Sequence, residues 1–203
     1  MEESKLPLVQ HFSNLREKPK WGLKLILAIV VMTLSAVIAA FAIDYNELYK
    51  DAGMTGAELE QAKMFAQIGG AIGGVFSAII GIGITFVIFL LISKIMKSDA
   101  SGKSIFSATL SYTLITKIIA LIVIIIQSIA GLSLTDYVST SLNVFDKGNK
   151  VLGAFNLQTI IGAYVFGVML FATNRFSKKS AIIWAIVYLV VLLGFALLGA
   201  SFP

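Results

Sequence analysis

The feature that most constrains the fold is a long run, residues 68–92, that contains no charged side chain. As an α-helix this run would rise about 37 Å, whereas the hydrocarbon core of a bilayer is about 30 Å thick. A soluble domain does not need a helix that is both so long and so apolar. The run is therefore predicted to cross a membrane with some tilt.

Small residues recur along this run at intervals of three and four, which places them on one face of the predicted helix. They are Gly70, Gly74, Ser77 and Gly81. Lipid provides no hydrophobic drive for helices to associate, so close contact along small residues is what holds such helices together. We expect this face to pack against another helix of the same chain, rather than to form a dimer or a pore.

Composition supports a membrane protein and excludes several kinds of active site. Hydrophobic residues make up 58% of the 203 residues and charged residues 13%, against about 25% charged in a soluble domain. Cysteine is absent and there is one histidine, so thiol catalysis is excluded and a histidine metal site or catalytic triad has no basis. We expect no enzyme activity, no cofactor and no metal.

Four further apolar runs predict an all-α, polytopic membrane helix bundle with five transmembrane helices in a single domain, residues 1–203. The spans are expected at about 21–43, 68–92, 106–131, 154–172 and 181–199. In the polar segment 1–20, Leu8, Phe12 and Leu15 form a short apolar stripe, which predicts an amphipathic helix lying on the membrane surface. Thr55 and Glu58 have the spacing of a capping box, which predicts that the second spanning helix begins before it enters the membrane.

The distribution of lysine and arginine predicts the orientation. The amino-terminal region, the second loop and the fourth loop carry five, three and three of the sixteen basic residues, whereas the first and third loops carry two each. Basic residues concentrate on the cytoplasmic side, so the amino terminus should be cytoplasmic and the carboxyl terminus on the opposite side. The net charge of +5 belongs to these short segments, and no nucleic-acid partner is expected.

Lys117 is the only charged residue inside an uninterrupted apolar run, since Lys24 precedes the first run, and a charge at that depth is a functional hypothesis by default. No predicted span contains a carboxylate to pair with it. Its side chain either reaches back to the headgroups near Lys103 or holds a lipid phosphate or another anion. Asn156 and Gln158 open the fourth span, where they either bridge helices or join Lys117 in a polar patch that contacts a ligand or lipid.

Several segments together carry a family resemblance. They are Phe12 followed by Pro19-Lys20-Trp21, the glycine-rich second span, Ser101-Gly102-Lys103-Ser104-Ile105-Phe106 leading to Tyr112, Phe155-Asn156-Leu157, and Ser177-Lys178-Lys179-Ser180-Ala181. In this order they resemble the Yip (Ypt-interacting protein) family of integral membrane proteins, in its prokaryotic branch. The resemblance implies an all-helical membrane domain with no known catalytic activity. Eukaryotic members carry an acidic-aromatic-glycine-proline motif where this chain has Lys18-Pro19-Lys20-Trp21, so no Rab-type GTPase partner is expected.

Two functions from different classes follow. The leading hypothesis is a non-enzymatic scaffold or adaptor that acts through helix, lipid and protein interactions in the cell membrane. The alternative is a small transporter or lipid-handling protein that uses the polar patch around Lys117. Membrane lipids are the expected partners, with other membrane proteins or a second copy of the chain as further candidates. The alternative requires Lys117, Asn156 and Gln158 to lie close together in the folded bundle, and the scaffold hypothesis does not.

Overall fold

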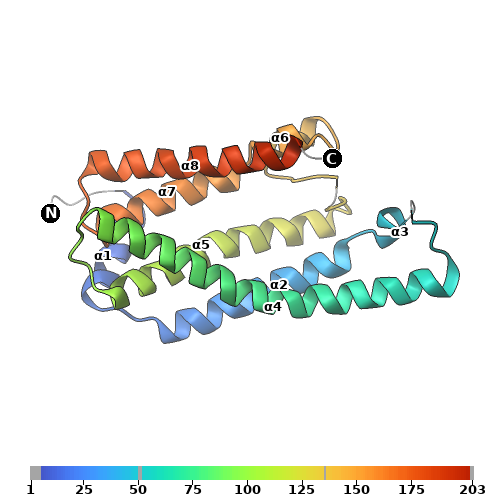
Figure 1. The fold of residues 1–203 in the computed structure, drawn as a ribbon, viewed down its shortest axis with the longest axis horizontal. Coiled ribbons are helices and arrows are strands. Elements are labelled where there is room, and N and C mark those ends of the chain that lie inside the picture. Colours follow the sequence, from blue (N-terminus) through green and yellow to red (C-terminus); the bar gives the residue numbers. More distant parts are fainter. Residues whose placement is uncertain (1–5, 50–51, 135, 202–203) are drawn as a thin grey trace.

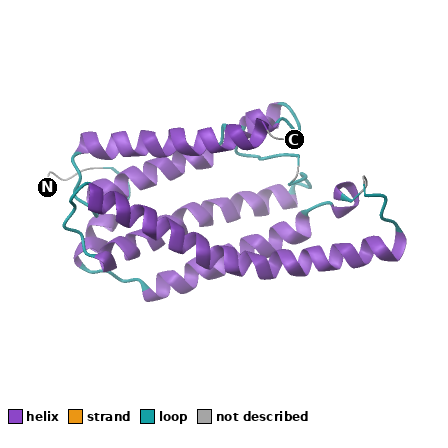
Figure 2. Cartoon of the chain, viewed as in Figure 1, coloured by secondary structure: helices purple, strands orange, loops and turns teal. Residues whose placement is uncertain are grey.

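A computed structural model describes residues 6–49, 52–134 and 136–201, and every regular element in these ranges is helical. The elements are α1 (Val9–Glu17), α2 (Gly22–Ala42), α3 (Tyr45–Leu48), α4 (Gly56–Ile95), α5 (Gly102–Ile129), the 3-10 helix η1 (Leu142–Phe145), α6 (Lys150–Ala154), α7 (Leu157–Ala172) and α8 (Lys178–Ser201). Figure 2 shows them joined by loops into an elongated bundle. Residues 1–5 of the predicted surface segment and the last two residues of the predicted domain lie outside the described residues.

The all-α prediction is confirmed, and four helices, α2, α4, α5 and α8, are long and apolar enough to cross a membrane. The fourth predicted span differs from these. It begins with the separate turn α6, and α7 itself has 16 residues, which rise about 24 Å. The bundle thus has four candidate membrane spans and one shorter apolar helix.

The long helices form two groups that lie side by side in Figure 1. In the first group α2 packs against both α4 and α5, and in the second α7 packs against α8. The groups meet through the contact between α5 and α7, and α1 packs against both of these helices. We call the end of the bundle that carries α1 the α1 end.

The small-residue face of α4 packs against α2. A Cβ atom added at Gly70 would lie 3.3 Å from the Cβ of Ala40, and one added at Gly74 would lie 2.2 Å from the Cβ of Ala36. The second distance is shorter than any real carbon contact, so the two helix backbones approach closely because residue 74 has no side chain. α4 begins at Gly56, ahead of the apolar run, as predicted. The Thr55 side chain makes no capping hydrogen bond, however, so the predicted capping box is wrong.

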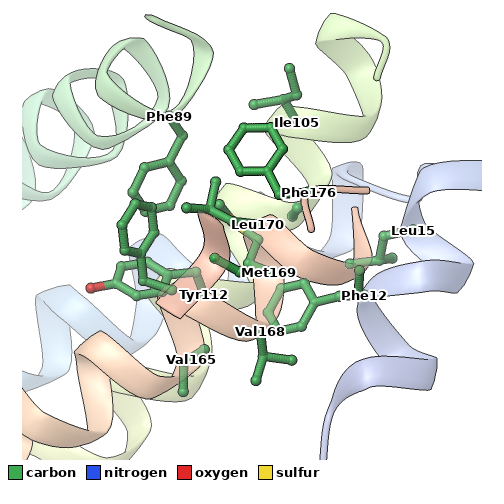
Figure 3. Packing of buried hydrophobic residues seen from close by; sticks show 14 of the residues in the cluster. Phe12, Leu15, Phe89, Ile105, Tyr112, Val165, Val168, Met169, Leu170 and Phe176 are labelled. Atoms are coloured by element: carbon green, nitrogen blue, oxygen red, sulfur yellow. The ribbon is translucent and has the colours of Figure 1, made fainter. Parts of the chain in front are cut away.

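Helix α1 forms where the sequence predicts an amphipathic helix, but its apolar stripe faces protein instead of lipid. Val9, Phe12 and Leu15 are buried and belong to the main core cluster together with residues of α5 and α7. Figure 3 shows Phe12 and Leu15 pointing toward Met169 and Phe176. The prediction of a helix that lies with this stripe on the membrane is therefore wrong, because the ends of α5 and α7 cover the stripe.

Packing is dense at the α1 end and loosens toward the opposite end. The buried residues of α5 run from Ser104 to Thr113, and beyond them only Gln127 in this helix is buried. In α7 they run from Gly162 to Ala172. Stacked aromatic rings belong to this core, and the centroid of the Phe89 ring lies 4.9 Å from that of Phe166. The core therefore joins the two helix groups at one end and leaves a cavity between them further along.

The contact at Gly74 gives a direct test of the packing between α2 and α4. Gly74→Ala should lower the free energy of unfolding by about 1–3 kcal/mol, because the added methyl group cannot fit against Ala36. Thermal unfolding in a mild detergent measures the change. Gly73→Ala is the matched control, since a Cβ at residue 73 meets nothing within 4 Å, and its unfolding midpoint should stay at the wild-type value or rise. Equal midpoints for both variants would contradict the proposed contact.

Candidate functional site

A cavity of about 640 Å³ lies between the two helix groups and is lined by residues of α2, α4, α5, α7 and α8. Lys117, Asn156 and Gln158 all line it, as do Gly74, Ser77 and Gly81 of the small-residue face of α4. Gly70 lies one turn before Gly74 in α4 and packs against Ala40 instead. The structure thus brings the three polar candidates to one place.

Local sequence explains why space remains here. Where α4 passes the cavity, its face is mostly small residues, with Ile82 as the one large side chain among the described lining residues of this helix, so much of the gap between the two groups stays unfilled. On the other wall Gly162 of α7 lines the cavity, and α7 begins only at Leu157. Small residues on one wall and a late helix start on the other leave a volume that the apolar core does not reach.

Lys117 lies near the middle of α5, about 21 Å along the helix from Lys103. Its side chain is exposed and lines the cavity, and no hydrogen bond or ion pair joins it to another residue in the described part of the chain. Lys117 thus places a positive charge among the residues that line the cavity.

The two amide side chains bind the loop before α7 and do not bridge two spanning helices. The Asn156 Oδ1 accepts hydrogen bonds from the backbone N–H of Gln158, at 2.8 Å, and from the hydroxyl of Thr140, at 2.9 Å. The Gln158 Nε2 donates to the Thr140 Oγ1 at 3.1 Å. Asn156 thus caps the first turn of α7 and, together with Gln158, fixes the cavity wall.

A pair of tyrosines that the sequence analysis did not select completes the site. The hydroxyl groups of Tyr112 and Tyr188 lie 2.5 Å apart and both residues line the cavity. They meet over Gly162, where an added Cβ would lie 3.3 Å from the Tyr188 hydroxyl. Figure 3 shows the Tyr112 ring in the apolar cluster with its hydroxyl at the edge. No sequence motif points to Tyr188, because a single tyrosine in an apolar run is common.

The chemistry of the cavity is that of a positively charged, hydrogen-bonding site. Apart from Lys117, the lining residues carry apolar, hydroxyl or amide side chains, and within the described residues no carboxylate lines the cavity. The same part of the chain holds no cluster of three or more potential metal ligands. The arrangement can bind an anionic or polar group, and it offers no pair of groups for acid-base catalysis.

A second polar cluster, at the α1 end, holds the helices together. The Arg16 guanidinium donates to the Thr173 carbonyl at 2.8 Å and forms an ion pair with Asp99 at 2.6 Å. The hydrogen bond from Arg16 lowers the pKa of the Asp99 carboxyl from its ordinary value. The Ser104 hydroxyl donates to the Arg16 carbonyl at 2.8 Å. These contacts join α1 to two loops and to the first turn of α5, and they have a structural role.

Comparison with known proteins agrees with this architecture. A model of the Yip1 domain matches residues 7–200 of the chain. The chain is 29% identical over 203 residues to a Bacillus subtilis (strain 168) protein named membrane protein YknW, and the alignment covers 94% of this chain and 85% of that protein. No solved structure matches the chain.

Water in the cavity can be tested with single cysteines, because the natural chain has none. Ser77→Cys places a thiol on the cavity wall, and Ile79→Cys places one on an exposed face of the same helix outside the cavity. In proteoliposomes a charged thiol reagent should modify residue 77 several times faster, because the reactive thiolate forms only where water reaches. Equal and slow modification of both variants would show that the cavity is dry.

Proposed function

The chain belongs to the Yip1 family of membrane proteins, and from that premise we propose that it is a non-enzymatic multi-pass protein that holds the anionic headgroup of a membrane lipid in its intramembrane cavity. The observation that carries this proposal is the convergence of Lys117, Asn156 and Gln158 on one cavity. A scaffold that acts only through its outer surface has no need of this convergence.

The charge of Lys117 supports an anionic ligand. A lysine near the centre of a membrane helix costs about 3 kcal/mol, which an opposite charge nearby offsets. Within the described residues no carboxylate lines the cavity, so the countercharge comes with the ligand. Membrane lipids surround the bundle and carry phosphate groups, which pair well with an ammonium group. The absence of an acid-base pair among the lining residues supports a binding function over a catalytic one.

A scaffold or adaptor function is a second candidate, favoured by one observation on α4. Gly69 and Gly73 are exposed, and a Cβ at either position would meet nothing within 4 Å. Their spacing of four residues gives α4 a second small edge, turned away from α2, against which another membrane helix could pack closely. The partner would be another membrane protein or a second copy of the chain.

We further propose that α7 crosses the membrane as a fifth span and that the α1 end faces the cytoplasm. The described ends of the chain lie at opposite ends of the bundle, which fits an odd number of crossings (Figure 1). In intact cells Lys179→Cys should be protected from a membrane-impermeant thiol reagent, whereas Phe145→Cys, at the other end, should react. The reverse pattern would invert the orientation, and equal reaction of both variants would contradict the crossing of α7.

The lipid proposal predicts that Lys117→Met removes a bound anionic lipid. Native mass spectrometry of protein extracted in a mild detergent should show wild type retaining the lipid and Lys117→Met retaining about tenfold less, because the ion pair to phosphate is lost. Lys94→Met is the matched control, since Lys94 is exposed at the end of α4 outside the cavity. It should retain the lipid as wild type does.

The same spectra separate the two candidate functions. Equal lipid retention by Lys117→Met and wild type would overturn the role of Lys117. A wild-type protein without specific lipid, but with a defined oligomeric state or a bound membrane protein, would favour the scaffold and direct attention to Gly69 and Gly73.

A further inference from the structure

We infer that the cavity selects lipids whose headgroup joins a phosphate diester to a free polyol, as in phosphatidylglycerol, and that the Tyr112–Tyr188 hydroxyl pair is the second contact for that phosphate. This inference rests on the headgroup binding proposed above and names the class of lipid. Its basis is the inventory of hydrogen-bond donors and acceptors that the cavity leaves unused.

The tyrosine pair contributes one unused donor. Each hydroxyl has a single hydrogen, so one of the two donates to the other across the 2.5 Å contact. The hydrogen of the accepting hydroxyl then has no acceptor among the described residues. It lies on the cavity wall, and a buried donor without an acceptor is unfavourable. A ligand oxygen placed there would satisfy it.

Lys117 adds three further N–H donors on the same wall, and none of them has an acceptor in the described part of the chain. Lys117 follows Tyr112 by five residues, which places it about 7.5 Å further along α5 and about 140° around the helix, at the other edge of the lining face. The flexible lysine side chain has to fold across this face to bring its ammonium group to a phosphate at the tyrosine pair. Several unused donors and one positive charge fit a group that consists of negatively charged acceptor oxygens, and a phosphate diester is such a group.

Three of the other hydroxyls on the cavity wall offer acceptors instead of donors. Ser35, Thr85 and Thr116 each donate to a backbone carbonyl one turn earlier in their own helix, at 2.9, 2.8 and 2.9 Å. With their hydrogens used in this way, only their oxygen lone pairs face the cavity. They lie on α2, α4 and α5, so acceptors surround the ligand from three helices. Hydroxyl groups of a polyol are neutral donors that match them.

An ammonium-bearing headgroup fits the same cavity poorly. Ethanolamine and choline carry a positive charge, and the one charged side chain among the described lining residues is Lys117, which is also positive. No carboxylate among those residues would compensate the second cation, and two like charges at one site repel each other. The cavity therefore discriminates by charge against zwitterionic lipids.

The experiment compares two lipids with identical acyl chains on delipidated protein in mild detergent. Native mass spectrometry should show wild type binding phosphatidylglycerol at least about tenfold more tightly than phosphatidylethanolamine. The double variant with Tyr112→Phe and Tyr188→Phe removes both hydroxyls and keeps both rings, so it should lower phosphatidylglycerol binding about tenfold and reduce the ratio. Tyr164→Phe is the control, because that hydroxyl donates to the Pro7 carbonyl outside the cavity, and it should bind as wild type does.

The outcomes distinguish this inference from the proposed function. Equal binding of the two lipids by wild type, or an unchanged ratio in the double variant, overturns the inference. If Lys117→Met still loses both lipids in that case, the headgroup-binding function stands without the selectivity. Added glycerophosphate, which lacks acyl chains, should leave the bound lipid in place. If glycerophosphate at a concentration equal to that of the lipid displaced it, the site would bind a soluble phosphate compound, and the inference of a lipid ligand would be wrong.

Discussion

No water reaches the hydrocarbon core of a bilayer, so each polar group at that depth must find its partner within the protein or its ligand. Several hydroxyl groups in the long helices meet this requirement within their own helix. The hydroxyl of Thr109, for example, donates to a backbone carbonyl one turn earlier. In the loop between α5 and α7, two buried side-chain amides satisfy backbone carbonyl groups. Gln127 donates to the carbonyls of Ser133 and Tyr137, and Asn143 donates to that of Asp136. The cavity gathers further unsatisfied donors, those of Lys117 and of the tyrosine pair, and this is why we propose it as a ligand site; outside it, the hydroxyl oxygens of Ser111 and Ser128 are also buried without a partner among the described residues.

The same constraint explains why the two ends of the bundle differ. At the α1 end, apolar rings and the contacts of Arg16 fill the space between helices, so the groups cannot separate there. Beyond Tyr112 and Tyr188 the packing changes from large rings to glycine, serine and threonine. The tyrosine pair marks this boundary, with rings in the core and hydroxyls in the cavity. A rigid end and an open region of one bundle are thus consequences of residue size.

Hydropathy alone predicted much of the fold, because a run of apolar residues has few alternatives to a membrane helix. The span expected at 21–43 is α2, Gly22–Ala42, nearly residue for residue. The start of α7 was missed because the break depends on the Asn156 cap and on its long-range partner Thr140. The covered stripe of α1 was missed for a similar reason: the periodicity of Phe12 and Leu15 shows that a face is apolar and not what covers it. Convergence of Lys117 with the amides depends on helix rotation, which periodicity does not fix.

The short length of α7 has a consequence for the surrounding bilayer. Its apolar part rises about 24 Å, several ångströms less than the thickness of an ordinary hydrocarbon core, whereas α4 alone has 40 residues. If α7 crosses the membrane as the proposed fifth span, lipids beside it meet a hydrophobic mismatch, which they relieve most readily by thinning locally. Such thinning would draw the headgroup plane on that side toward Asn156, at the edge of the cavity. A lipid entering there would then cross less hydrocarbon than at a full-length helix of the bundle.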